Sequence, residues 1–110
     1  PAPGTFWVAP NPDIIGKVTF HADYSLPVEK VRNEFMRLVS ESKLWDGRTC
    51  GLVVLSATDR TMELRGIMSA RNWGDAFDLE CHLREQMIGY IRNNFPDCLP
   101  KQRLEKIGEA

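Results

Sequence analysis

The sequence lacks every glycine-rich motif with which a chain cradles a phosphate group. Between the third extended pattern and the second helical pattern, Gly74 is the only glycine, so neither GxGxxG nor GxxxxGK[ST] is present. The nucleophile motif G-x-S-x-G is also missing, because Gly66, Ser69 and Gly74 have the wrong spacing. We therefore expect this corner to be a helix N-terminus capped by Asn72 or Asp75, and not a catalytic turn.

Cysteine and histidine are too few and too scattered for a built site. Cys50, Cys81 and Cys98 contain no CxxC pair, which fits neither a disulfide framework nor a zinc site. Cys81 and His82 are neighbours on an expected helix, where adjacent side chains point about 100° apart and cannot share a proton. We expect free thiols, no metal, no cofactor and no enzymatic activity.

Long apolar runs and an excess of basic charge are absent too. No apolar stretch approaches the ~18 residues of a membrane span, and we expect no signal peptide. The 14 basic and 15 acidic residues give a net charge of −1, which argues against nucleic acid as a partner. The chain starts at Pro1 and not at a methionine, so we expect it to be part of a longer protein.

The 110 residues are enough for one domain with one core. We expect a proline-rich linker or arm at residues 1–13, an α/β domain at 14–100 and a tail at 101–110. Alternating apolar and polar residues predict strands at 14–24 and 61–70.

A nearly continuous apolar run at 50–58 predicts a further strand, preceded by a turn at Asp46-Gly47. Apolar residues at three- and four-residue steps predict a helix after Ser25, with Ser25 as a possible cap, and a second helix over about 75–94. In the second helix we expect one apolar stripe of eight residues: Ala76, Leu79, Leu83, Met87 and Ile91, widened by Phe77, Ile88 and Tyr90.

The predicted order is strand, helix, strand, strand, helix. Since only 58–61 separates the last two strands, they should form an antiparallel hairpin, and the third strand can lie between the first two. We therefore predict an α+β fold: a ferredoxin-like split β-α-β-β-α sheet with two helices on one face.

Two tryptophans at expected turns are the candidate subunit-contact residues. Trp45 and Trp73 both lie beside predicted helix ends. Each could cover the core of its own domain or anchor a contact between subunits, where tryptophan is enriched. Binding of single-stranded RNA by the open sheet face is a weaker alternative. The net charge is unfavourable, and the face has no aromatic residue at its outward positions Thr19, His21, Glu63 and Arg65.

Three segments in a fixed order carry a resemblance to a known family. They are YSLPVEKVR at 24–32, SKLWDGR at 42–48 and LRGIMSARN at 64–72. Together with most of residues 16–100, they resemble the C-terminal cytoplasmic α/β domain of the small-conductance mechanosensitive channel (MscS) family, in its bacterial branch. The region after the last helix, FPDCLPKQ, departs from the strand-like G-I-x-I-P-F-P-Q segment of many members.

The resemblance implies a vestibule and assembly domain of a mechanosensitive ion channel. It implies a homo-oligomer, a heptamer, whose parent chain lies in the cell inner membrane with this domain on the cytoplasmic side. The alternative is a soluble regulatory module that binds a small ligand. That reading would favour a glycine-rich loop after the first strand, whereas DYSLP at 23–27 has no glycine.

Overall fold

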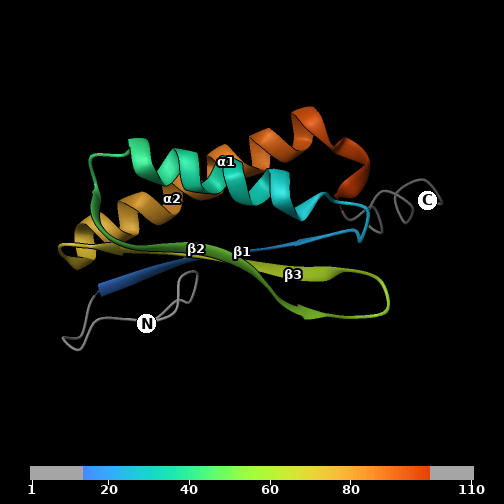
Figure 1. Cartoon of the computed structure of the whole chain (residues 1–110), viewed down its shortest axis with the longest axis horizontal. Helices are drawn as coiled ribbons and strands as arrows, with labels where there is room; N and C mark the ends of the chain where they lie inside the picture. Colours follow the sequence, from blue (N-terminus) through green and yellow to red (C-terminus); the bar gives the residue numbers. More distant parts are fainter. Residues whose placement is uncertain (1–13, 100–110) are drawn as a thin grey trace, which may run out of the picture.

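The computed structural model describes residues 14–99 (Figure 1). The elements follow in the order β1 (Ile14–Ala22), α1 (Val28–Glu41), β2 (Trp45–Ala57), β3 (Met62–Ala70), α2 (Trp73–Asn94) and a 3-10 helix η1 (Pro96–Cys98). The expected arm at 1–13, the tail at 101–110 and the domain end at residue 100 lie outside the described residues.

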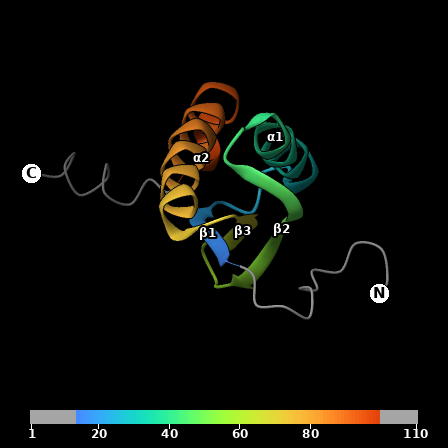
Figure 2. The same cartoon turned by 90° about the vertical axis from the view of Figure 1, so that its left-hand side faces the viewer.

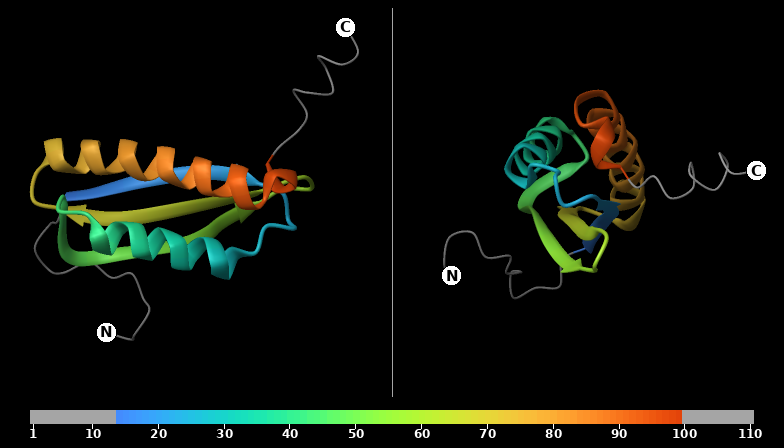
Figure 3. Two further views of the ribbon diagram at one scale, coloured as in Figure 1. Left: turned by 90° about the horizontal axis from the view of Figure 1, so that it is seen from above. Right: turned by 90° about the vertical axis from the view of Figure 1, so that its right-hand side faces the viewer.

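The sheet has three antiparallel strands in the order β1-β3-β2. The expectation that the third strand lies between the first two is confirmed. Both helices lie on the same face of the sheet, side by side, with α2 over β1 and α1 over β2 (Figures 2 and 3). The described part of the chain is therefore an α+β domain of two layers.

The alternating patterns of β1 and β3 place one set of side chains under the helices. Val18 and Ala22 of β1 are buried, and so are Met62, Leu64 and Met68 of β3. The expected first strand was two residues too long. β1 ends at Ala22, and Tyr24 is 51% exposed, with its hydroxyl donating to the carbonyl of Thr58.

The start of β2 corrects the expected turn at Asp46-Gly47. β2 begins at Trp45, five residues before the predicted strand, and the Asp-Gly pair lies within it. Gly47 has φ of 85°, and the register with β3 shifts between Trp45 and Cys50. Gly47 therefore allows the backbone to adopt the positive φ that this irregularity in the strand requires, as a glycine does in a turn.

The helices bury one apolar stripe each. In α1 the buried residues are Val31, Phe35 and Val39. In α2 all five main positions of the predicted stripe are buried: Ala76, Leu79, Leu83, Met87 and Ile91. The widening of that stripe was wrong for two of three residues, because Phe77 and Ile88 are exposed.

The two helix starts differ in how they are capped. Asn72 caps α2, since its Oδ1 accepts a hydrogen bond of 2.8 Å from the amide of Asp75. The expectation for Ser25 was wrong: the N-cap position of α1 is Pro27, and the Ser25 hydroxyl donates to Asp23 Oδ2 instead, at 2.7 Å. The loop before α1 is therefore held by its own side chains.

Candidate subunit-contact surface

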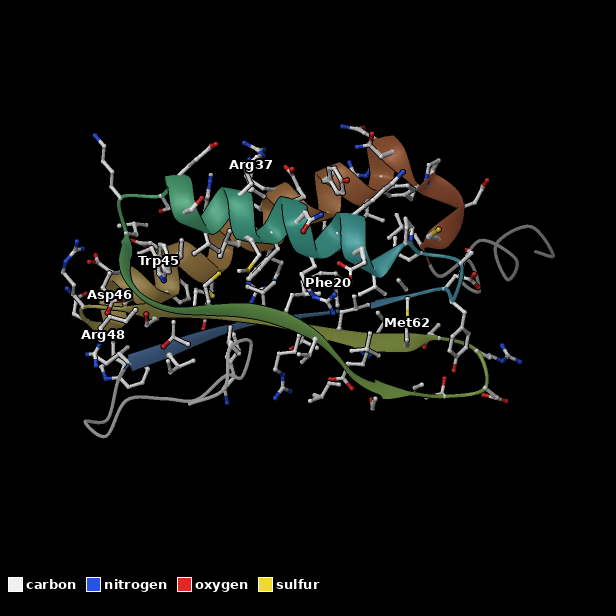
Figure 4. The ribbon with its side chains drawn as sticks, in the orientation of Figure 1. Phe20, Arg37, Trp45, Asp46, Arg48 and Met62 are labelled. Carbon is white, nitrogen blue, oxygen red and sulfur yellow. The ribbon has the colours of Figure 1, made fainter. Side chains whose placement is uncertain are left out.

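Trp45 is partly buried at the first position of β2. Its indole packs against the core, and its Nε1 donates a 2.9 Å hydrogen bond to the carbonyl of Thr49 (Figure 4). Both the apolar ring and the polar N–H of this tryptophan are thus satisfied within the domain. Of the two roles left open for Trp45, this geometry fits a lid on the core.

The segment after Trp45 is tied to β3 through one buried serine. Ser69 is fully buried, and its hydroxyl donates to Asp46 Oδ1. The same hydroxyl accepts a 2.8 Å hydrogen bond from the Thr49 amide, and Asp46 Oδ1 accepts a 3.1 Å bond from the Arg48 amide. These bonds hold the irregular start of β2 in one conformation.

Two of the three segments that carry the family resemblance therefore meet in space. Trp45 pairs with Ala70 in the β2–β3 register, and Arg71 Nη1 lies 3.4 Å from the carbonyl of Lys43. Figure 4 shows Trp45, Asp46 and Arg48 together at one end of the sheet. The sequence did not predict the contact between Ser69 and Asp46, because it joins residues 23 positions apart through a strand pairing.

Trp73 has a different environment from Trp45. It is the first residue of α2 and is 68% exposed. Phe77, one helical turn later, is 64% exposed, and Ile88 is 37% exposed. We call these three residues the α2 stripe. They share one side of the helix because residues four apart, and eleven apart, return to nearly the same direction.

The α2 stripe lies on the side of α2 away from α1. Glu80, whose direction on the helix is close to that of Trp73, reaches the outer edge of β1 and accepts a 2.8 Å hydrogen bond from the Lys17 amide. The stripe is thus lateral to the sheet. Phe77 was missed as a candidate contact residue, although its i,i+4 spacing from Trp73 was a signal that could have found it.

Cys50 and the two histidines lie on three different elements of the described chain. Cys50 lies beside Met36, with 3.4 Å between Sγ and Sδ, and burial raises the pKa of its thiol from 9.0 to about 11. His21 and His82 are both exposed, on β1 and α2. Within residues 14–99 no group of three or more His, Cys, Asp and Glu side chains is placed to hold a metal ion.

The fold and this surface define a small α+β domain with an exposed aromatic helix side. Comparisons of the chain with models of known families, with curated proteins and with solved structures find no match. Neither described helix is both long enough and apolar enough to cross a membrane.

Proposed function

We propose that this chain is a vestibule and assembly domain of a mechanosensitive ion channel of the small-conductance family, and that it acts without catalysis. Its parent chain would lie in the cell inner membrane, with this domain on the cytoplasmic side as one wall of a homo-oligomeric, heptameric cage. The three ordered segments at 24–32, 42–48 and 64–72 support the family, and the α2 stripe supports the assembly role.

The α2 stripe is the observation that carries the assembly role. Trp73 and Phe77 are the most exposed large apolar side chains of the described residues, and they are adjacent on one helix. Exposed aromatic residues of this size are typical anchors of protein–protein contacts. Trp73, rather than Trp45, is therefore the better candidate for a contact between subunits.

We also propose that the α+β domain has the ferredoxin-like arrangement. A strand order of β1-β3-β2 with both helices on one face is compatible with a ferredoxin-like split β-α-β-β-α sheet.

The ligand-binding alternative receives less support from the loop between β1 and α1. An anion or nucleotide bound there would need free backbone N–H groups. The Ser25 amide donates to Asp23 Oδ2 at 2.9 Å, the Leu26 amide to the carbonyl of Asp23 at 3.1 Å, and the Asp23 amide to the carbonyl of Cys98 at 2.7 Å. These donors are already engaged inside the domain.

Self-association of the 110-residue chain tests the assembly role. We expect weak association by sedimentation velocity, because in the parent protein the membrane part would supply a high effective concentration. Trp73→Ala should weaken the association constant at least tenfold, about 1.4 kcal/mol. Met36→Ala is the matched control, since Met36 is an apolar side chain on α1 that is 39% exposed. Equal association of the two variants would remove the stripe from the interface.

The sequence encoded upstream of Pro1 tests the channel assignment. We expect several hydrophobic helices there, the last of them rich in small residues that line a pore. An upstream catalytic domain would exclude the channel assignment while leaving the self-association result intact.

A further inference from the structure

The two outer edges of the sheet are each occupied by a charged side chain from the helix above. At the β1 edge, Glu80 of α2 accepts the 2.8 Å hydrogen bond from the backbone amide of Lys17. At the β2 edge, Arg32 of α1 donates through Nε to the backbone carbonyl of Leu52, at 3.0 Å. β1 and β2 are the edge strands of the described sheet, so these are the places where another strand could be added.

Both bonds engage backbone groups that point away from β3. The Lys17 amide donates to a helix side chain and therefore does not donate to β3, although Lys17 lies opposite Ile67 in the register. Leu52 lies opposite Gly66, whose other neighbour in the sheet is Val18. A residue of a central strand directs its amide and carbonyl to one neighbour only, so an outward carbonyl at Leu52 is consistent with Gly66 bonding to β1.

Gly16 makes room for the cap at the β1 edge. A methyl group on Gly16 would stand 3.1 Å from Glu80 Cγ and 3.2 Å from Glu80 Oε2. The methyl group would also stand 2.8 Å from Met68 Cε, and Glu80 would have to shift by a few tenths of an ångström. The absence of a side chain at Gly16 is therefore part of the arrangement that brings Glu80 to the Lys17 amide.

We propose that Glu80 and Arg32 are edge guards that prevent a second copy of this chain from pairing with the sheet strand to strand. Unpaired edge groups are templates for such pairing, and charged side chains at the edge are a common protection. The exposed lysine at position 17 on the β1 edge acts in the same direction. This inference is independent of the proposed channel role and restricts self-association to surfaces other than the strand edges.

Amide hydrogen exchange of the 110-residue chain tests whether Glu80 protects the Lys17 amide. The Lys17 amide should exchange slowly in the unmodified chain, and Glu80→Ala should speed its exchange about tenfold or more, the equivalent of roughly one net hydrogen bond. Glu80→Gln retains an accepting oxygen and should restore protection. A fast Lys17 amide in the unmodified chain would overturn the proposal.

Sedimentation velocity tests the consequence for assembly. Glu80→Ala and Arg32→Ala should each raise the self-association constant about tenfold. Glu85→Ala and Arg37→Ala make the same changes of charge at exposed positions and should leave it unchanged. Circular dichroism checks that each variant is folded. If Glu80→Ala is not folded, Arg32→Ala alone tests the proposal, and Glu80→Gln, which keeps the accepting oxygen, should associate like the unmodified chain. Equal association of Glu80→Ala and Glu85→Ala would refute the guard role. If Trp73→Ala associates as strongly as the unmodified chain, the assembly role proposed for the α2 stripe is wrong, but the role proposed for Glu80 and Arg32 is not affected.

Discussion

At the scale of single residues, glycine shows how one missing side chain positions a helix. Gly66 of β3 lies directly under the ring of Phe35, which is fully buried on α1. A methyl group on Gly66 would stand 2.6 Å from Phe35 Cε1 and 2.9 Å from Cε2. The backbone of the central strand therefore provides the flat surface on which α1 rests.

Substitution of Gly66 by alanine should accordingly destabilise the domain. The ring of Phe35 is enclosed by the core, so the overpacking should cost about 1–3 kcal/mol of unfolding free energy, measured by urea titration. Gly89→Ala is the matched control with the opposite sign. A methyl group there meets nothing within 4 Å, and the helix interior should gain up to about 1 kcal/mol. The same sign for both variants would contradict this account of Gly66.

At the scale of elements, the start of β2 depends on a hydrogen bond that comes from another strand. Ser69 of β3 connects to Asp46 and Thr49 of β2, around the positive φ of Gly47. The strand pairing alone does not hold this segment, since its register shifts between Trp45 and Cys50. The buried hydroxyl replaces the missing ladder bonds.

Ser69→Ala should therefore cost about 1–3 kcal/mol, because it leaves the Thr49 amide without its partner and removes one of the two hydrogen bonds to Asp46 Oδ1. Urea unfolding gives the free energy, and Trp45 fluorescence should report a looser environment in the folded state. Ser56→Ala is the control. Ser56 is exposed on the same strand and bonds only Glu63 at its hydroxyl in the described structure, at 2.9 Å. If Ser69→Ala lowers the free energy of unfolding no more than Ser56→Ala does, the hydrogen bonds of Ser69 do not hold the start of β2.

At the scale of the whole molecule, one core joins every element of the described chain. Its members come from all three strands, both long helices and Cys98 of η1, with further partly buried residues around them. The large apolar side chains that are exposed lie outside this core, at the α2 stripe, along the far half of β2 (Val54 and Leu55, 41% and 46% exposed), and singly at Tyr24 and Met36. The side chains of the core and those of the proposed assembly surface are therefore different residues.

A single core predicts a single unfolding transition. Far-ultraviolet circular dichroism and tryptophan fluorescence should give the same urea midpoint, since no element packs apart from the others. The partly buried Trp45 reports mainly on the sheet, whereas circular dichroism is dominated by the helices, so the comparison is sensitive to separate unfolding of α2. Two midpoints would show that the helix layer opens independently of the sheet.

The elements that were predicted correctly are those whose signal is local. The alternation in β1 and β3 and the five buried apolar positions of α2 depend on strand and helix periodicity, which a few residues determine. The errors fall where the decisive partner is distant. Asp46-Gly47 is a common turn pair, but its conformation is set by Ser69 in another strand. Phe77 is apolar, but its direction on α2 points it past the sheet edge.

The sequence by itself determined the order of the elements, the helical and extended periods and the absence of any known phosphate or nucleophile motif. It also contained the resemblance on which the channel proposal depends. Only the tertiary structure decided which tryptophan is covered and which is exposed, because burial depends on the elements that pack nearby. It alone revealed Glu80 and Arg32 at the sheet edges, since a side chain can occupy an outward backbone group only after the helices have packed on the sheet.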